Sequence, residues 1–517
     1  MDLGTAFAAA CARSPGAVAI VDGAVRRTYG AWAEEVARVA GALARLGLAR
    51  GDHLVAVMAN GHPMATLYWA CQSLGAIFTP FNWRATAADI GYVLNDAEAR
   101  LVAHDDGAAA AVRDAAAQLG IAASRLIVAG AGEGTSFAVL AAAPPVAAPA
   151  GADERDICLM LYTSGTTGRP KGVPRSHRAE RTAAAACLAQ LRYRFGEVQL
   201  GVMPMFHTMG IRIMLASATL SGKLVCMRGF DAGAALDLIA AERVTAMFLV
   251  PTMFHDMLHH PRFAAADIGS VRNVAYAGMS MTSALERACR EAFRPEVFAN
   301  YYGSSEIFTF TVCDHLDRKP GCAGRAGINQ QIRVVRADAT GNAGPDDIVP
   351  AGEVGEVIAS MASPEAFAGY WKRPDADARA IRSGWYFTGD LGRMDDDGEL
   401  FLCGRIDDMI ISGGENIHPE EVEDALAECA LVRQAAVVGL PDERWGQTVV
   451  AFVEAAVPDA SARALDAHCR ASSLARFKRP RAYVFVERLP KSASGKLLRR
   501  LLREGQYATS SDHDTTL

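Results

Sequence analysis

The stretch YTSGTTGRPKG, from Tyr162 to Gly172, is the most informative part of the sequence. It places three glycines among four hydroxyl residues and ends with two cations, Arg169 and Lys171. Glycines bring backbone N–H groups close to a ligand, hydroxyls add hydrogen bonds, and Arg and Lys neutralise negative charge. This combination favours a polyphosphate ligand, although the G-x-x-x-x-G-K-[ST] spacing of a Walker A loop is absent.

Composition excludes several classes of protein. A net charge of −6 gives no indication of a nucleic-acid partner. The eleven cysteines form no C-x-x-C pair, which argues against a disulfide framework or a zinc ribbon and favours a reducing compartment. The sequence shows no signal peptide, and prolines or polar residues interrupt the uncharged stretches 63–83 and 134–152. We therefore expect a cytoplasmic protein without a membrane partner, and leave open whether it forms a homodimer.

Strand and helix patterns alternate along most of the chain, which predicts mainly parallel α/β units. We expect a helix over Ala31–Leu46, a buried helix, a break at Gly75 and a short strand within 63–83, and a loop over 134–152. The expected strands are Val18–Val21, Leu54–Met58, Ile157–Leu161, Val244–Val250 and Val271–Ala277. Turns and short β pieces are expected over 384–402. A compact unit follows, with a helix from Pro419 and strands at Ala435–Gly439 and Val449–Glu454.

The Tyr162–Gly172 run resembles the signature of the adenylate-forming (AMP-binding) superfamily. Further matching segments follow in order: Met203–His207, Tyr301–Glu306, Tyr386–Asp390, Gly404–Ile417 and Pro490–Lys496. The 4-chlorobenzoate–CoA ligase branch is the most similar, through Gly404–Pro419, Arg444–Gln447, Phe477–Pro480 and Leu497–Arg500. The resemblance implies an α/β protein: a large multi-subdomain N-terminal domain (1–404) with mixed sheets and helices, a hinge (405–407) at Asp407, and a small mobile α+β C-terminal domain (408–517). The lack of an apolar pattern predicts disorder over 505–517.

The resemblance also implies an acid–CoA ligase. In such an enzyme the carboxylate attacks the α-phosphate of ATP, pyrophosphate leaves, and the acyl-adenylate passes its acyl group to CoA. ATP and CoA are then substrates and Mg²⁺ is the metal. Because negative charge is crowded on both reactants, catalysis depends on positioning and on cations around the phosphates.

The ATP site is implied residue by residue. Glu306 and Thr163 are the candidate Mg²⁺ ligands, because Mg²⁺ takes hard oxygen donors. Ser305 stands where the family usually has Thr, which keeps the hydroxyl. Asp390 is a candidate acceptor for the ribose hydroxyls, with Arg405 beside it. The remaining nucleotide residues are Ser164, Gly165, Thr166, Thr167, Gly168, Arg169, Lys171, Ala277, Gly278, Met279, Asn300, Tyr301, Tyr302 and Gly303.

Catalytic roles are implied for Lys496, His207, Arg405 and Thr167. Lys496 is the adenylation lysine, which bridges the substrate carboxylate and the α-phosphate with a mobile charge. His207 is expected at the carboxylate end of the acyl pocket. His255 and His259 lack the H-E-x-x-H pattern of a zinc site and are interpreted as structural.

The CoA site needs cations for the nucleotide phosphates and a narrow tunnel for pantetheine. Gly413 and Gly414 have no side chains to obstruct such a tunnel. Trp445 can stack on adenine, and an aromatic–cation cluster follows later in the chain. The implied CoA residues are Arg84, Gly413, Gly414, Trp445, Phe477, Arg479 and Arg481.

The implied acyl pocket is apolar and aromatic, with one or two hydroxyls and no Arg or Lys for a second carboxylate. It consists of His207, Thr208, Met209, Phe248, Val250, Ala277, Tyr301, Gly303, Phe308 and Thr309. Phe308 and Thr309 replace the Met and Asn of the chlorobenzoate branch. We expect an aryl or heteroaryl acid, such as a benzoate or furoate.

Three further functions remain open. One is a short- or medium-chain aliphatic acyl-CoA synthetase. Another is an adenylation enzyme that loads a carrier protein, although His207 stands where amino-acid-specific domains usually have Asp and no carrier domain follows. The third, from another class, is a nucleotide-binding regulatory protein without activity. The presence of Lys496, Asp390 and Glu306 argues against an inactive protein.

Overall fold

The computed structural model describes residues 1–145, 151–163, 169–337, 343–491, 497–510 and 513–515. Two large sheets form the part of the chain before about residue 330, and both have a parallel centre with antiparallel strands at an edge. The seven-stranded sheet runs β7 (Thr135–Ser136), β6 (Leu126–Ala129), β5 (Leu101–Asp105), β3 (His53–Val57), β4 (Ile77–Phe81), β8 (Ile157–Thr163), β9 (Lys171–Ser176).

The nine-stranded sheet carries most of the candidate site along one edge. Its order is β16 (Arg325–Ala326), β15 (Thr311–Cys313), β14 (Val297–Tyr302), β13 (Asn273–Tyr276), β12 (Ala246–Leu249), β10 (Val198–Gly201), β11 (Lys223–Cys226), β1 (Val18–Asp22), β2 (Val25–Thr28). Strands β12, β13 and β14 are parallel neighbours in register. The segments that leave their carboxyl ends therefore start side by side.

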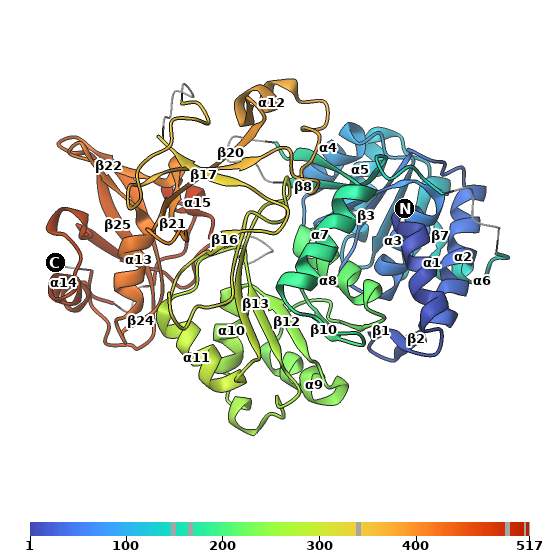
Figure 1. Cartoon of the computed structure of the whole chain (residues 1–517), viewed down its shortest axis with the longest axis horizontal. Helices are drawn as coiled ribbons and strands as arrows, with labels where there is room; N and C mark the ends of the chain where they lie inside the picture. The colour runs from blue at the N-terminus through green and yellow to red at the C-terminus, as the bar shows by residue number, and fades with distance from the viewer. Residues whose placement is uncertain (146–150, 164–168, 338–342, 492–496, 511–512, 516–517) are drawn as a thin grey trace.

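One hydrophobic core joins the two sheets, and a second covers the other face of the seven-stranded sheet. The first includes α1 (Leu3–Arg13), α2 (Tyr29–Arg45), α3 (His62–Leu74), α7 (His177–Gln190) and α8 (Thr208–Thr219). The second lies under α4 (Ala87–Asp96) and α5 (Ala109–Leu119). The other helices of this part are α9 (Ala232–Glu242), α10 (Pro251–Leu258) and α11 (Ser283–Phe293). Figure 1 shows α7 and α8 between the two strand systems.

The strongest local sequence patterns are confirmed. The α2 helix buries Trp32, Val36 and Leu43 on one face, and Gly47 follows it with a φ of +86°. The buried α3 helix ends at Gly75, a left-handed cap, before β4. Such a backbone conformation favours glycine, which explains why the apolar run 63–83 breaks there.

Two weaker patterns led to wrong local predictions. The expected loop 134–152 contains a helix, α6 (Phe137–Ala142), which is capped by Ser136 and buries Phe137 and Leu140. The expected short β pieces of 384–402 include a ten-residue strand, β20 (Trp385–Met394). Its five-stranded sheet also contains β17 (Ile332–Val335), β18 (Gly355–Ser360), β19 (Ile381–Arg382) and β21 (Leu400–Arg405), near α12 (Pro374–Ala380). Pairing with distant strands, which a local pattern does not contain, extends β20.

The last 110 or so residues form a compact α+β unit with its own two core clusters. Its sheet runs β23 (Glu415–Ile417), β22 (Ile410–Ser412), β25 (Gly446–Ala455), β24 (Val432–Asp442), and β26 (Ala482–Phe485) pairs with β25. Its helices are α13 (Pro419–Ala427), α14 (Ala462–Ala471) and α15 (Arg499–Arg503). Figure 1 places this unit, in orange and red, beside the yellow-green strands of the large part.

The described residues after 504 pack on this unit, in contrast to the disorder that their composition predicts. Thr509 bridges to Val486, Asp514 bridges to Ser461, and the Tyr507 ring lies 4.9 Å from the Phe452 ring. These contacts use mainly backbone pairing at a sheet edge, so they leave no apolar periodicity in the sequence.

All eleven cysteines are free in this structure, and ten of them are buried. Within the part of the chain that the structure describes, no helix has the length and apolarity needed to cross a membrane.

A cluster of charged side chains joins α13 and α15 to the segment after β21. Arg499 lies 3.1 Å from Glu420 and 2.8 Å from Glu423, and Arg499 and Arg503 both contact Asp408. Glu420 Oε2 is buried without a hydrogen-bond partner among the described residues. Burial raises the pKa of Glu420 to about 7, and the Arg499 charge opposes this shift only in part.

We expect Glu420→Gln to stabilise the C-terminal unit more at pH 8 than at pH 5. The folded state holds the Glu420 proton up to about pH 7, whereas the unfolded chain releases it near its ordinary value of about 4.3. The free energy of unfolding of the wild type therefore falls by about 1–3 kcal/mol as the pH rises between these two pKa values. The neutral glutamine in the variant removes that loss. Calorimetric Tm values of wild type and variant at pH 5, 6, 7 and 8 measure the difference. A difference that is independent of pH contradicts the assignment.

Candidate active site

The phosphate-loop candidate connects two antiparallel neighbours. Thr163 at the end of β8 pairs with Lys171 at the start of β9. The Arg169 guanidinium lies 5.3 Å from the centre of the Tyr92 ring. The other predicted loop residues, Ser164, Gly165, Thr166, Thr167 and Gly168, lie outside the described residues. The segment between β8 and β9 is thus flanked on both sides by residues that the sequence assigned to nucleotide binding.

Glu306 lies in a buried polar cluster beside Lys171. The Tyr370 hydroxyl donates to Glu306 Oε1 at 2.7 Å, and Lys171 Nζ lies 4.2 Å above the Tyr370 ring. Arg175 donates to the Glu306 carbonyl at 2.7 Å, which fixes the backbone. Burial lowers the pKa of Lys171, while the Glu306 carboxylate opposes the shift. A buried carboxylate among hydroxyl groups fits Mg²⁺, which prefers hard oxygen donors.

Asp390, at the end of one matched motif, forms hydrogen bonds with residues of two other matched motifs. Its Oδ2 accepts from the Tyr302 hydroxyl at 2.6 Å, and its Oδ1 accepts from Arg405 at 2.7 Å. The register of β20 and β21 sets Asp390 directly opposite Arg405. Each carboxylate oxygen accepts more than one hydrogen bond, so these contacts leave capacity for two sugar hydroxyls.

The two candidate adenine segments leave adjacent strands. Ala277, Gly278 and Met279 follow β13, and Asn300–Gly303 end β14 and continue beyond it. A Cβ on Gly303 would lie 1.7 Å from the Phe308 carbonyl oxygen, so only glycine fits there. Gly278 has a φ of +88°, which also favours glycine. Ser305 is half-buried in the same turn.

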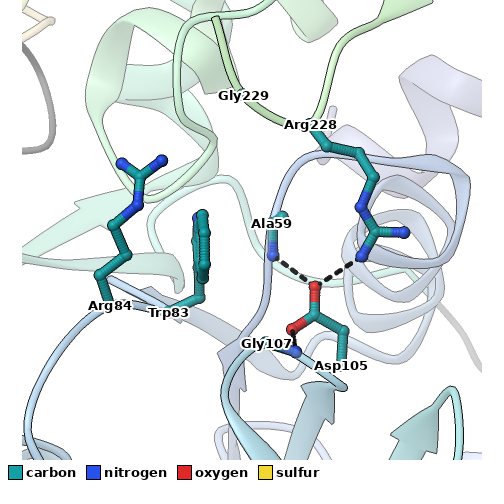
Figure 2. A pocket seen from close by; sticks show the side chains of 7 residues that line it. All are labelled: Ala59, Trp83, Arg84, Asp105, Gly107, Arg228 and Gly229. Carbon is teal, nitrogen blue, oxygen red and sulfur yellow. Dashed lines mark hydrogen bonds and ion pairs between the residues drawn. The ribbon is translucent and has the colours of Figure 1, made fainter.

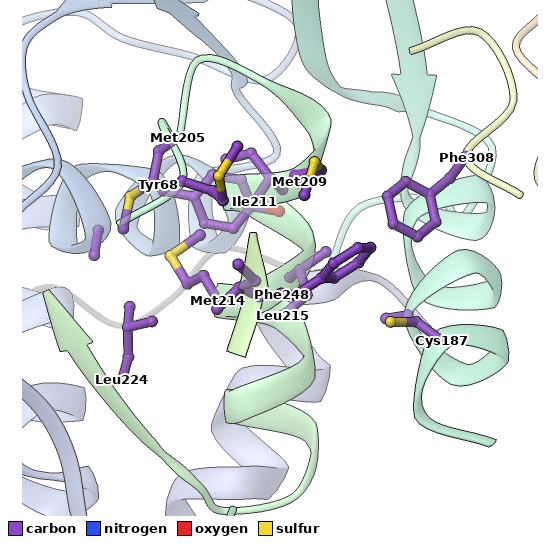
Figure 3. Close-up of a cluster of buried hydrophobic side chains, with 14 of the residues drawn as sticks. Tyr68, Cys187, Met205, Met209, Ile211, Met214, Leu215, Leu224, Phe248 and Phe308 are labelled. Carbon is purple, nitrogen blue, oxygen red and sulfur yellow. The ribbon is translucent and has the colours of Figure 1, made fainter. Parts of the chain in front are cut away.

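The candidate acyl residues form an aromatic cluster at the same strand ends. The Tyr301 ring lies 5.1 Å from Phe308 and 5.5 Å from Phe248, between ring centres. The Tyr301 hydroxyl and Thr309 Oγ1 are 2.6 Å apart. Figure 3 shows Phe248 and Phe308 near one another, with Met209 above them. Val250 and Ala277 are also buried.

Helix α8 contributes the other end of this group. His207 precedes the helix, and its ring lies 4.7 Å from that of Phe206. Thr208 Oγ1 is buried without a hydrogen-bond partner among the described residues, so it can bond to a ligand. His255 on α10 and His259, which follows that helix, stack on each other with ring centres 4.1 Å apart. Among the described side chains, no candidate metal-ligand cluster includes them.

A buried ion cluster beneath the aromatic residues was not predicted. Glu180 lies between Arg175 and Arg212, at 2.9 Å and 3.1 Å, and all three side chains are fully buried. The Arg212 guanidinium lies 4.4 Å from the centre of the Phe308 ring. Both arginines flanked sequence motifs, but nothing in their local pattern indicated burial. Tyr370 was missed for the same reason.

The candidate CoA residues fall into two groups. In the C-terminal unit, Arg481 lies 4.4 Å from the Trp445 ring, and the Gly413 N–H donates to the Trp445 carbonyl at 2.8 Å. Gly414 has a φ of +86° and open space at its Cβ position. Arg479 Nε is buried without a partner among the described residues, and the Phe477 side chain is exposed.

Arg84 is separate from that group and lines a pocket of about 260 Å³. Its guanidinium stacks on Trp83 at 4.3 Å, and Arg228 on the far wall pairs with Asp105 at 2.9 Å. Figure 2 shows the two guanidinium groups on opposite sides of the pocket. In Figure 1, α4, which follows Arg84, belongs to the large part, whereas β25 belongs to the C-terminal unit. This structure therefore does not bring the predicted CoA residues together, and Lys496 lies outside the described residues.

Comparison with known proteins identifies the family. The AMP-binding enzyme family matches residues 7–371, and the AMP-binding enzyme C-terminal domain matches residues 421–496. This chain belongs to the AMP-binding enzyme family. The boundary between the two matched regions falls where the fold changes from the large part to the C-terminal unit.

Relatives of this AMP-binding enzyme carry acid–CoA ligase names. It is 36% identical to a feruloyl-CoA synthase of an Amycolatopsis species over 95% of its own length and 96% of that protein. It is 34% identical to a 4-chlorobenzoate–CoA ligase of an Arthrobacter species (97% and 94%) and 33% identical to the long-chain-fatty-acid–CoA ligase FadD13 of Mycobacterium tuberculosis (94% and 94%). Among solved structures, the anthranilate CoA ligase AuaEII with anthranoyl-AMP superposes with a TM-score of 0.90, at 26% identity over 98% and 97% of the chains. These matches confirm the resemblance to the adenylate-forming superfamily.

Proposed function

We propose that this AMP-binding enzyme joins an aryl or heteroaryl carboxylic acid to CoA. The reaction consumes ATP and proceeds through an acyl-adenylate, as in the AMP-forming acyl-CoA synthetases that it resembles over nearly its whole length. The observation that carries the choice of acid is the aromatic cluster of Phe248, Tyr301 and Phe308 at the strand ends beside the nucleotide segments. Flat rings pack well on such walls.

The charge of the pocket wall also favours a monocarboxylic acid. Arg212 contacts the aromatic cluster, but Phe308 covers its guanidinium and Glu180 pairs with it. A second carboxylate on the substrate would therefore lose its hydration without gaining a partner, which is costly in a buried site. The Tyr301 hydroxyl and Thr309 supply hydrogen bonds suited to a neutral ring substituent.

In adenylation, the protein positions two anions against each other. Lys171 and Arg169 would bind the ATP phosphates, and Asp390 with Arg405 would bind the ribose. Glu306 and Thr163 would hold Mg²⁺, which neutralises phosphate charge when bound. Lys496 would hold the substrate carboxylate near the α-phosphate, with His207 and Thr167 beside the reacting groups.

In thioester formation, the C-terminal unit would rotate about Asp407, in the turn Ile406–Asp408 between β21 and β22. The separation of Arg84 from the Trp445 group supports such a movement, because both sets match CoA contacts of the chlorobenzoate branch. Rotation would withdraw Lys496 and bring Gly413 and Gly414 to the pantetheine path. No protein cysteine need act as nucleophile, because CoA supplies the thiol.

A panel of acids tests the substrate class. We expect kcat/KM with ATP and CoA to be higher for benzoate-type and cinnamate-type acids than for octanoate, and palmitate to be rejected. One methylene in an apolar pocket is worth only about 1–3 kcal/mol, so small acids separate weakly and long chains strongly. Phe308→Ala should admit longer or para-substituted acids, with Phe254→Leu, in the core outside the cluster, as a control. A wild-type preference for palmitate over benzoate would favour an aliphatic acyl-CoA synthetase. It would contradict the proposed substrate class but not the acid–CoA ligase reaction.

Product analysis distinguishes the ligase from an inactive regulatory protein and from a carrier-protein loading enzyme. Acyl-CoA formation excludes the inactive protein, and acyl transfer only to a carrier protein would indicate the loading enzyme.

The eleven free cysteines, ten of them buried, support the expected reducing environment of the cytoplasm.

Variants of the Trp445 group test the CoA assignment. We expect Trp445→Ala and Arg479→Ala to raise the KM for CoA by about tenfold or more and leave the KM for ATP unchanged, since loss of uniform binding raises KM alone. Arg433→Ala, an exposed arginine on β24, is the matched control. A fall in acid-dependent pyrophosphate exchange in the first two variants would contradict the assignment.

A further inference from the structure

Four side chains that can bind a metal converge at the edge of the nine-stranded sheet. One ligand atom each from Cys313, His315, Cys322 and Glu399 lies within 4.8 Å of all the others. The two thiols and Glu399 are buried, and His315 is half-buried. Cys313 ends β15, His315 and Cys322 lie in the loop that leads to β16, and Glu399 immediately precedes β21. Nothing in the sequence indicated this cluster, because its cysteines are nine residues apart and its acid is distant.

We propose that these four residues form a structural zinc site. Two thiolates, an imidazole and a carboxylate are typical zinc ligands, and four protein ligands close the tetrahedron without an open position for catalysis. Zn–S and Zn–N bonds of about 2.3 and 2.0 Å set ligand atoms about 3.3–3.8 Å apart, so small side-chain shifts complete the site. Each Cys–SH loses its proton to solvent water as its S–Zn bond forms, and no oxidant or reductant is needed.

The surroundings of the cluster suit zinc ligands. His315 Nε2 lies 3.1 Å from Glu399 Oε1, and Asp314 lies 3.3 Å from His315 Nδ1. A carboxylate on the outer ring nitrogen orients a ligand histidine and fixes its tautomer. The Gly324 N–H donates to Cys322 Sγ at 3.1 Å, a bond that stabilises a thiolate.

The charge count is also balanced. Two thiolates and one carboxylate carry three negative charges against the two positive charges of zinc. Arg325 Nε lies 2.8 Å from Glu399 Oε1 and offsets the remaining negative charge. Glu399 Oε2, which now accepts from Cys322 at 3.3 Å, is the oxygen left to face the metal.

The position of the site links three segments of the protein. The Asn300 side chain donates to the Cys322 carbonyl at 2.9 Å, and Ala323 and Gly324 exchange backbone hydrogen bonds with Leu400. A bound zinc ion would therefore hold the 314–324 loop against β21, whose far end carries Arg405. Its expected effect is on the stability of this edge of the sheet, not on the chemistry itself.

Metal analysis of the purified full-length protein tests the proposal. After expression with zinc, we expect about one zinc ion per chain, and Co²⁺ exchange should give the thiolate–cobalt charge-transfer band of a tetrahedral site. Cys313→Ser and His315→Ala should each weaken zinc binding at least about tenfold. Cys289→Ser, a buried free cysteine on α11, should keep the full zinc content. His315→Ala alters a half-buried residue and remains informative if the cysteine variant does not fold.

Thermal unfolding with a zinc chelator provides a second measurement. The wild-type Tm should fall in chelator and recover with added zinc, whereas the His315→Ala Tm should not respond. The proposal is overturned if folded wild type binds no zinc from a zinc buffer, because the cluster is then a thiol–carboxylate hydrogen-bond network. It is also overturned if thiol titration shows a Cys313–Cys322 disulfide in the freshly purified protein, or if Cys313→Ser and His315→Ala both retain zinc.

Discussion

Replacement of Lys496 by alanine should reduce acyl-adenylate formation by about 10²–10³ and leave acyl transfer from pre-made acyl-adenylate to CoA nearly unchanged. The variant loses one charge contact that is strongest in the transition state, and such a contact is worth about 3–4 kcal/mol. Single-turnover pyrophosphate release measures the first half-reaction, and thioester formation from synthetic acyl-AMP measures the second.

Lys491→Ala is the matched control, because Lys491 is an exposed lysine five positions earlier in the chain. It should keep both half-reactions. Equal losses in the two half-reactions of Lys496→Ala would show that this lysine does not act in adenylation alone. They would also contradict the hypothesis that Lys496 enters the active site only in the adenylation conformation.

Replacement of Gly414 by leucine should block acyl-CoA formation and spare adenylation. Nothing lies within 4 Å of the Cβ position at Gly414 in this structure, so a side chain meets no obstacle here. The leucine side chain would meet an obstacle only in the conformation in which Ser412–Glu415 lies against pantetheine. We expect a pyrophosphate burst of about one equivalent per site and a fall of at least about 10² in steady-state acyl-CoA formation. Asp407→Pro should likewise impair one half-reaction far more than the other.

The control for Gly414→Leu must carry the same backbone strain. Gly505 has a φ of +73°, also has open space at its Cβ position, and follows α15 in the same unit. Gly505→Leu therefore reproduces the cost of a left-handed leucine without approaching the predicted tunnel. If both variants lose stability and both half-reactions together, Gly414 is a turn residue and the tunnel assignment is wrong.

The sequence predicted those parts of the fold that depend on local patterns. The amphipathic face of α2, the break at Gly75 and the strands that end at the site are set by spacing within about 20 residues. The extension of β20 and the packing of Tyr507 were not predictable in this way, because each depends on pairing with strands far away in the chain. Segment 137–142 was wrongly predicted as a loop because it lies among alanines just before Pro144 and Pro145, and only two residues one turn apart, Phe137 and Leu140, are buried.

The candidate site could likewise be predicted from the sequence only in part. Motif residues such as Asp390, Arg405 and Glu306 were identified one by one, and the structure places Asp390 against Arg405 and Tyr302. Tyr370 and Arg212 had no local signal, since their partners lie tens of residues away, and the Cys313 cluster was missed because its spacing matches no metal motif and Glu399 is distant in the chain. Sequence patterns therefore found the residues that match a family, and only the fold revealed the partners that hold them.

The Phe308 ring over the Arg212 guanidinium has a consequence for how this enzyme could acquire new specificity. Loss of the ring would not simply lengthen an apolar slot, because it would uncover the Arg212 guanidinium, whose partner Glu180 is shared with Arg175. Replacement of Phe308 by a small residue would then place a cation within reach of a para-carboxylate on the substrate. A change at one residue could therefore convert an enzyme for aryl monocarboxylic acids into one that also accepts dicarboxylic acids. Libraries at Phe308 are the direct way to sample that change.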